Sequence, residues 1–110
     1  MTVRELAKEL SLTVKAGEDG LDCDVSGCYI GDLLSLAMSS IKEANVWITI
    51  QTSVNIVAVS VLTEGACVIL CSSQEPDENA KKKADIEGVP LLTSDKQAYE
   101  LAAALSKLGI

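Results

Sequence analysis

Short apolar runs alternate with helix-like segments along the second half of the chain. The runs cover residues 46–50, 67–71 and 90–93, and small hydroxyl, amide or acidic residues follow each of them. A helical connection returns the chain to the same edge of a sheet, so strands that alternate with helices pair in parallel. The pattern therefore predicts a small α/β domain in which these three strands are mutually parallel.

The N-terminal third predicts one helix and two extended segments. Residues 3–10 carry apolar side chains at helical spacing, and Thr2 and Glu5 form a capping box in front of them. A short alternating strand at 12–14 and an extended stretch at 21–29 follow. The chain is thus expected to begin with a helix and to become extended twice before the first apolar run.

Two apolar segments are predicted to be buried helices. Asp32 is suited to cap a helix over residues 33–40, whose side chains are apolar almost all round. We expect this helix to be buried on more than one side, in the core or against a second subunit. Residues 54–64 are rich in β-branched side chains, which favour a strand. Asn55 can cap the segment as a helix and Gly65 can end it, and a parallel connection requires a helix there, so we predict a helix.

Two more helices complete the pattern. Pro76 and Asp77 open a charged helix that Gly88 closes, and Asp95 is expected to open a last helix with a regular apolar face. No linker, low-complexity segment or long repeat interrupts the chain. Residues 1–110 are therefore predicted to form a single domain.

The composition indicates an aliphatic core and argues against several partners. Hydrophobic residues make up 48% of the 110 residues, but phenylalanine is absent, so Val, Ile, Leu and Ala must fill the interior. The net charge of −7 repels phosphate backbones and no basic stripe opposes it, which argues against nucleic acid as a partner. No apolar run approaches the roughly 20 residues of a membrane helix, and the N-terminus does not resemble a signal peptide. We expect a cytoplasmic protein that binds neither nucleic acid nor membrane.

The sequence contains no histidine, the commonest general base and metal ligand. Serine–histidine and cysteine–histidine nucleophile pairs are thereby excluded. Neighbouring acids such as Asp22 and Asp24 could supply carboxylates for acid–base chemistry, but acids in a turn are ordinarily solvated. The protein is therefore predicted not to be an enzyme.

Four cysteines raise the question of a metal site. Cys67 and Cys71 stand at the two ends of a predicted strand, about 13 Å apart at about 3.3 Å per residue. One metal ion with bonds of about 2.3 Å cannot be shared over that distance. Cys23 and Cys28 differ by an odd number of residues, so they would face opposite sides of an unbroken strand. We predict buried, free cysteines, no cofactor and no bound metal.

Polar residues follow each of the three parallel strands. Because the carboxyl ends of parallel strands meet at one edge of a sheet, these residues are expected to converge where open α/β folds hold ligands. Hydroxyl and amide groups beside helix N-termini can cradle a small anion such as a nucleotide phosphate, although each can also be an ordinary helix cap. The candidate ligand-binding residues are Thr52, Ser53, Asn55, Ser72, Ser73, Thr93, Ser94 and Asp95. The first three are expected to contribute most, because their strand lies nearest the predicted switch point of the sheet.

A second hypothesis is a module for protein interaction or assembly. The apolar helix at 33–40, together with Tyr29 and Ile30, could form a homodimer face or dock a partner enzyme. Plain core packing would explain the same residues. A contiguous exposed apolar patch would distinguish an interface from a core.

Six short segments share their order and spacing with one known family. They are VRELA at 3–7, DCDVSG at 22–27, IGDLLS at 30–35, ITIQT at 48–52, NIVAV at 55–59 and GVPLLT at 88–93. On these segments the chain resembles the stand-alone DRTGG domain, which is related to the N-terminal domain of HPr kinase/phosphorylase. The likeness covers nearly the whole chain as one domain.

The resemblance implies a three-layer α/β/α sandwich with a mixed, largely parallel sheet of about five strands, as in the N-terminal domains of HPr kinase and Mur ligases. It also implies a non-catalytic regulatory role. Family members often stand beside CBS or phosphotransacetylase domains, and short stand-alone members often accompany iron-hydrogenases. The Asp-Arg-Thr that names the family would fall near residues 52–54 and its Gly-Gly near Ser72 and Ser73, but other residues occupy both places here. The chain also lacks a P-loop, so it resembles no kinase domain.

Overall fold

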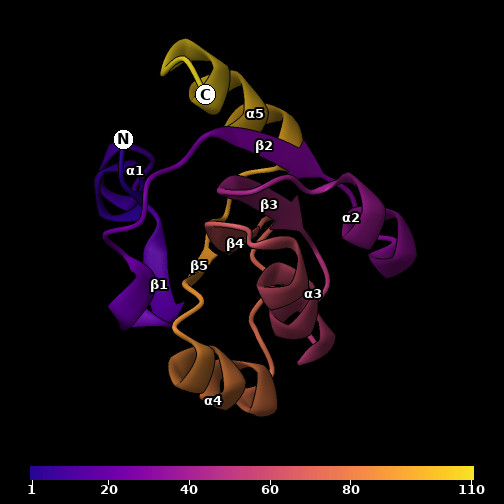
Figure 1. Cartoon of the computed structure of the whole chain (residues 1–110). Helices are drawn as coiled ribbons and strands as arrows, with labels where there is room; N and C mark the ends of the chain where they lie inside the picture. Colours follow the sequence, from indigo (N-terminus) through magenta and orange to yellow (C-terminus); the bar gives the residue numbers. More distant parts are fainter.

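A single five-stranded sheet organises the computed structural model, which describes residues 1–110 (Figure 1). The strands are β1 (Thr13–Ala16), β2 (Gly27–Ile30), β3 (Asn45–Thr49), β4 (Cys67–Leu70) and β5 (Leu91–Thr93). Their order in the sheet is β1-β5-β4-β3-β2. Strands β2 to β5 are parallel, and β1 is antiparallel to β5. The predicted mixed, largely parallel sheet is confirmed, including the mutual pairing of the three later strands.

Helices cover both faces of the sheet. They are α1 (Val3–Glu9), α2 (Leu34–Ser40), α3 (Asn55–Thr63), α4 (Glu78–Glu87) and α5 (Ala98–Lys107), with one 3₁₀ turn at Glu18–Gly20. The crossover helices α2, α3 and α4 pack on one face, while α1 and α5 pack on the other (Figure 1). The fold is therefore the predicted three-layer α/β/α sandwich.

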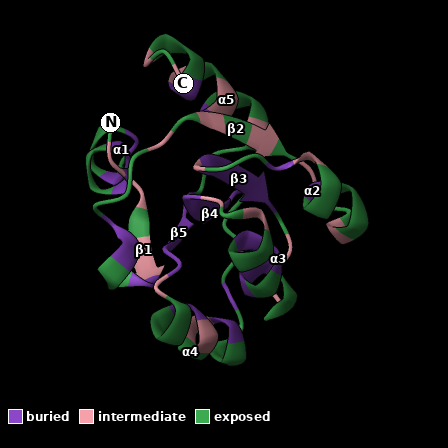
Figure 2. Ribbon diagram, in the orientation of Figure 1, coloured by how far each residue is buried: buried purple, intermediate pink, exposed green.

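The core divides at the sheet into two aliphatic clusters. Along β3, Val46 and Ile48 point towards α1 and α5, whereas Trp47 between them points towards α2 and α3, because successive side chains of a strand alternate. Every residue of β3, β4 and β5 is buried, as the purple centre of Figure 2 shows. Burial on both faces explains why these strands read as continuous apolar runs rather than as alternating ones.

The ambiguous segment 54–64 is a helix, as predicted. Its β-branched side chains would suit a strand, but the parallel pairing of β3 with β4 needs a helical crossover. Burial of its apolar side chains against the sheet stabilises the helix despite their low helix propensity. Its predicted cap is wrong: Asn55 is already the first helical residue and Val54 holds the N-cap position without a side-chain bond. Ser53 Oγ accepts the Asn55 N–H at 3.3 Å, and the helix ends at Glu64 in the left-handed conformation.

Two further predicted caps are also wrong. The N-cap position of α2 is taken by the apolar Leu33, and Asp32 lies outside the helix. Helix α5 does not start at Asp95: its N-cap residue is Gln97 and its first helical residue is Ala98. By contrast, the capping box of α1 forms as the sequence indicates. The start of α4 at Asp77 and its end at Gly88 are also as predicted, so the cap predictions hold for α1 and α4 and fail for α2, α3 and α5.

Helix α2 is less buried than its apolar sequence led us to expect. Of its residues only Ala37 is buried, while Leu36 and Met38 are about half exposed and the preceding Leu33 is 64% exposed. The helix packs against α3 with one side only, at the end of the sheet formed by β2 (Figure 2). Within one chain, the prediction of burial on more than one side is wrong.

Candidate functional site

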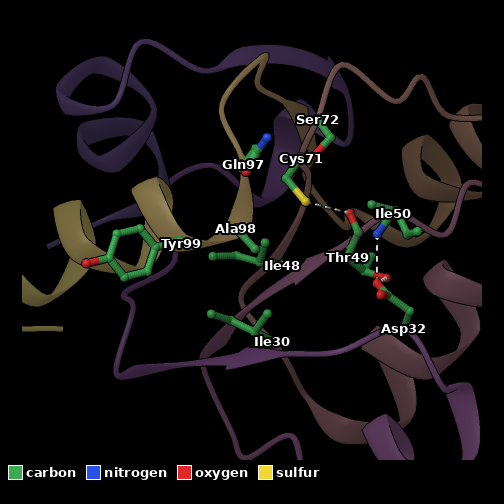
Figure 3. A pocket seen from close by; sticks show the side chains of 10 residues that line it. All are labelled: Ile30, Asp32, Ile48, Thr49, Ile50, Cys71, Ser72, Gln97, Ala98 and Tyr99. Atoms are coloured by element: carbon green, nitrogen blue, oxygen red, sulfur yellow. Dashed lines mark hydrogen bonds between the residues drawn. The ribbon is translucent and has the colours of Figure 1, made fainter.

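The carboxyl edge of the parallel strands carries two separate hollows. One, which we call the edge cleft, has a volume of about 280 Å³ and lies between the loops that follow β2, β3 and β4 and the first turn of α5 (Figure 3). The other, which we call the polar hollow, has a volume of about 340 Å³ and lies between the start of β1 and the loops that follow β4 and β5. Both are built where parallel strands end and their connections leave the sheet, the usual place for ligands in open α/β folds.

Asp32 holds one end of the edge cleft in shape. Its Oδ1 atom accepts hydrogen bonds from Thr49 Oγ1 at 2.9 Å and from the Ile50 N–H at 3.0 Å. Gln51 Nε2 donates to the Asp32 carbonyl at 2.8 Å. The Thr49 hydroxyl in turn accepts the Gln51 N–H at 3.2 Å. These bonds tie the loop after β2 to the loop after β3, so the carboxylate is positioned before any ligand arrives.

Apolar side chains form the rest of the cleft. Figure 3 shows Ile30, Ile48 and Ala98 between Tyr99 at one end and Asp32 at the other. Tyr99 is 83% exposed, and Asp32 is the one charged side chain that lines the cleft. The arrangement is an apolar surface with a hydrogen-bond acceptor at its end, which suits a flat, largely uncharged group that carries N–H or O–H donors.

Sequence reasoning overlooked Asp32 as a site residue because it assigned this aspartate to a helix cap. The sequence does hold a signal for it, because only Gly31 separates Asp32 from the end of an extended segment, and the other polar turns also follow extended segments. The parallel pairing of β2 with β3 brings that turn to the same edge. The extended stretch at 21–29 was not recognised as a member of the parallel set.

The eight predicted ligand-binding residues are divided among three places. Ser72 lines the edge cleft. Four others line the polar hollow: Ser73, Thr93, Ser94 and Asp95. The remaining three, Thr52, Ser53 and Asn55, lie at the start of α3 and line neither hollow.

We expected the switch point of the sheet beside β3, and the structure places it elsewhere. The helices α2, α3 and α4 all cover the same face, so the loop after β3 leaves the sheet in the same direction as its neighbours. The connections diverge between β4 and β5, because α4 and α5 pack on opposite faces. Two backbone hydrogen bonds join the loops at this point, from Ser72 N to Lys96 O at 2.8 Å and from Ser73 N to Ser94 O at 2.9 Å.

Ser72 and Ser73 both adopt the left-handed backbone conformation, with φ angles of 56° and 61°. This conformation disfavours residues with a Cβ atom and suits glycine. By the resemblance of the sequences, the Gly-Gly of the DRTGG domain would fall near these two positions. The backbone therefore keeps the shape that glycines would take without strain, and the bonds to the loop after β5 hold it there.

Replacing either serine by glycine is expected to stabilise the protein by about 0.5–1 kcal/mol, because the left-handed strain is relieved. No side-chain hydrogen bond of Ser72 or Ser73 opposes the change. Urea unfolding of Ser72→Gly and Ser73→Gly measures the effect, with Ser39→Gly in α2 as the control that should lose stability. Lower stability of both loop variants would contradict a strained loop.

The cysteines differ in their environments. Cys67 and Cys71 are buried on the α1/α5 face, and burial raises the pKa of the Cys67 thiol far above its ordinary value. Cys23 and Cys28 are exposed, so the prediction that all four are buried is wrong for these two. All four are free, and no group of three or more His, Cys, Asp or Glu side chains could hold a metal ion. None of the helices is both long and apolar enough to span a bilayer.

Comparison with known proteins assigns the chain to a family. The sequence matches the DRTGG domain over residues 5–108, almost its entire length. The chain belongs to the DRTGG domain family. The resemblance drawn from the six short segments is thereby confirmed, whereas the relation to HPr kinase stays a prediction.

A solved structure shares the fold of this DRTGG domain. It is the CBS and DRTGG region of the regulatory part of Clostridium perfringens pyrophosphatase, in complex with the activator diadenosine tetraphosphate. The superposition has a TM-score of 0.77 at 10% sequence identity, and it covers 94% of this chain and 45% of the other. This chain thus spans less than half of that regulatory region. No curated protein sequence matches the chain significantly.

Proposed function

We propose that this DRTGG domain is a non-catalytic regulatory module that senses a small ligand in the edge cleft. The observation that carries the proposal is the preorganised Asp32 carboxylate at the end of an apolar cleft on the carboxyl edge of the sheet. The chain contains no histidine, so no serine–histidine or cysteine–histidine pair can activate a nucleophile in the cleft. Binding without chemistry is the function that fits these groups.

Nucleosides and nucleotides are the first ligands to test. A base could lie on Ile30 and Ile48 and donate an N–H to the Asp32 carboxylate, since that carboxylate retains free acceptor capacity. An anionic group of the same ligand would have to lie outside the acidic end of the cleft. The predicted residues Thr52, Ser53 and Asn55 at the N-terminus of α3 remain its proposed contacts, because helix N-termini attract anions. The nucleotide activator of the pyrophosphatase region supports this choice of test compounds.

Binding can be followed with the single tryptophan of the chain. Trp47 is buried, and its Nε1 donates to the Gly31 carbonyl at 2.9 Å, directly before Asp32. A ligand that moves the loop after β2 should change the fluorescence of Trp47. Titration with adenosine, ATP and diadenosine tetraphosphate separates the contribution of a base from that of phosphates.

Filling the cleft should abolish this binding. Ala98→Phe places a ring between Tyr99 and the isoleucines, and we expect at least about a tenfold loss of affinity because the apolar contact area is taken. Ala103→Phe, on the exposed side of the same helix, is the matched control and should bind as the original protein does. Calorimetry measures both affinities. Equal affinities of the two variants would show that the ligand sits elsewhere.

A second candidate function is assembly through α2. Leu33 at its start, and Leu36 and Met38 on either side of the buried Ala37, are exposed near the edge strand β2, where one chain leaves them uncovered. A homodimer or a partner enzyme, including the hydrogenase association that the resemblance implies, would cover this apolar surface. Light scattering after size exclusion tests the dimer, and a monomer at every concentration would remove it.

A further inference from the structure

Helix α3 presents apolar side chains to solvent. Its inner side is buried against the sheet, whereas its outer side is exposed (Figure 2). The residues of the outer side follow one another at a spacing of three or four, and we call them the α3 stripe: Val54, Ala58, Val61 and Leu62. A helix that is apolar all round is ordinarily buried all round. In the single chain, however, Leu62 is 68% exposed and the α3 stripe has no cover.

The surface around the α3 stripe carries no charge. Charged residues make up 23% of the chain, yet none occurs at 33–41 or at 44–63, the segments that form α2, β3 and α3. The other three helices all carry charged side chains. Because the net charge is −7, most approaches of two copies bring acids together. At the α3 stripe two copies can meet without that repulsion.

The α3 stripe matches itself when two α3 helices pack antiparallel. With Ala58 on a two-fold axis, Val54 lies opposite the partner's Leu62, and Asn55 lies opposite the partner's Val61. The small side chain of Ala58 on the axis lets the two helices approach closely. A two-fold interface uses the same patch on both subunits, so it requires a patch that is complementary to itself.

The ends of α3 are complementary in charge in the same arrangement. Glu64 ends the helix, and antiparallel packing brings it to the N-terminus of the partner's α3. The free N–H groups of a helix N-terminus attract acids. No acidic residue stands in the first turn of α3, and its N-cap residue Val54 makes no side-chain hydrogen bond. We propose that the α3 stripe is a homodimer interface in which the α3 helices of two copies pack antiparallel about a two-fold axis at Ala58.

This inference rests on the assembly candidate and moves the centre of the interface from α2 to α3. It does not depend on a ligand in the edge cleft, because no residue of the α3 stripe lines that cleft. The N-terminus of α3 is also the proposed contact of a ligand's anionic group, so such an anion and the partner's Glu64 compete. The nine residues of α3 span only about 14 Å, which gives less contact than the about 800 Å² per partner of a standard interface. The dimer is therefore weak and dissociates on dilution.

Sedimentation velocity from about 10 μM to about 1 mM protein, the range of weak association, tests the dimer in the absence of ligand. We expect the dimer fraction to rise with concentration. Ala58→Glu brings two carboxylates together on the axis and should weaken association at least about tenfold. Ala103→Glu, at an exposed position of α5, is the matched control and should associate as the original protein does. Circular dichroism checks that both variants are folded.

Oxidative cross-linking tests the position of the axis. The exposed Cys23 and Cys28 are first replaced by serine. In that background Ala58→Cys should form a disulfide-linked dimer, because its two thiols face each other across the axis. Leu62→Cys alone should not, whereas a mixture of Leu62→Cys and Val54→Cys should. Non-reducing gel electrophoresis measures the linked fraction.

Three results would overturn the assignment. A monomer over the whole concentration range would leave the α3 stripe to a different protein. A dimer that persists in Ala58→Glu but dissociates in Leu36→Ser would place the interface on α2 alone. Equal cross-linking by Ala58→Cys and Leu62→Cys would contradict the antiparallel register. Ala58→Glu should bind adenosine in the edge cleft as the original protein does, so failure of the ligand-sensing proposal is distinguishable from failure of this one.

Discussion

Replacing Gly17 by alanine should destabilise the protein by about 2–5 kcal/mol. Gly17 has a φ angle of 74°, which costs about 1–2 kcal/mol for a residue with a Cβ atom. An added Cβ would also overlap the backbone carbonyl of Val89, and relieving such an overlap costs about 1–3 kcal/mol. The turn cannot easily shift away, because the Gly17 N–H donates to Asp85 Oδ1 at 2.8 Å. Urea unfolding measures the loss.

Gly88→Ala separates strain from steric overlap. Gly88 ends α4 with a φ angle of 68°, but the nearest atom to its added Cβ, Asp19 Cβ, lies 4.0 Å away. This variant should therefore lose only about 1 kcal/mol, the cost of the left-handed conformation alone. Equal losses in the two variants would mean that the overlap at Val89 is relieved at little cost.

Replacing Asp32 by alanine should affect both stability and binding. The buried Thr49 hydroxyl and the Ile50 N–H would lose their acceptor, which we expect to cost about 1–3 kcal/mol of unfolding free energy. The loops after β2 and β3 would no longer be tied together, so binding in the edge cleft should fall by at least about tenfold. Calorimetry and urea unfolding measure the two effects.

Asp32→Asn is the matched control. The amide oxygen can accept from both donors, so stability should stay within about 0.5 kcal/mol of the original. If a ligand N–H is bound by the carboxylate, its affinity should still fall, because a charged acceptor forms the stronger bond. Full binding by Asp32→Asn together with lost binding by Asp32→Ala would assign this residue a purely positioning role. Full binding by both would contradict the proposed function.

The arrangement of strands and helices could be predicted because it depends on patterns that are local in the chain. Strand–helix alternation implies parallel pairing, and this outweighed the β-branched composition of residues 54–64. The capping box of Thr2 and Glu5 likewise involves only neighbours in sequence.

The predicted cap at Asp32 failed because distant donors compete for its side chain. Asp32 can bond to the first turn of a following helix or to any other donor within reach, and the parallel pairing of β2 with β3 supplies Thr49 and Ile50. Only the folded chain decides between these acceptor roles. The predicted burial of α2 was wrong for a related reason. The apolar sequence of this helix does not show that it lies at the end of the sheet beside a single helix, α3.

The sequence by itself determined the fold class, the family and the edge of the sheet to which the polar turns converge, because strand direction follows from the alternation of elements. Only the tertiary structure decided which hollow each side chain enters. Ser72 and Ser73 are neighbours in sequence, yet one lines the edge cleft and the other the polar hollow. Their separation follows from the left-handed backbone held by the loop after β5 and from the packing of α4 and α5 on opposite faces. Those contacts join residues far apart in the chain, and no local pattern encodes them.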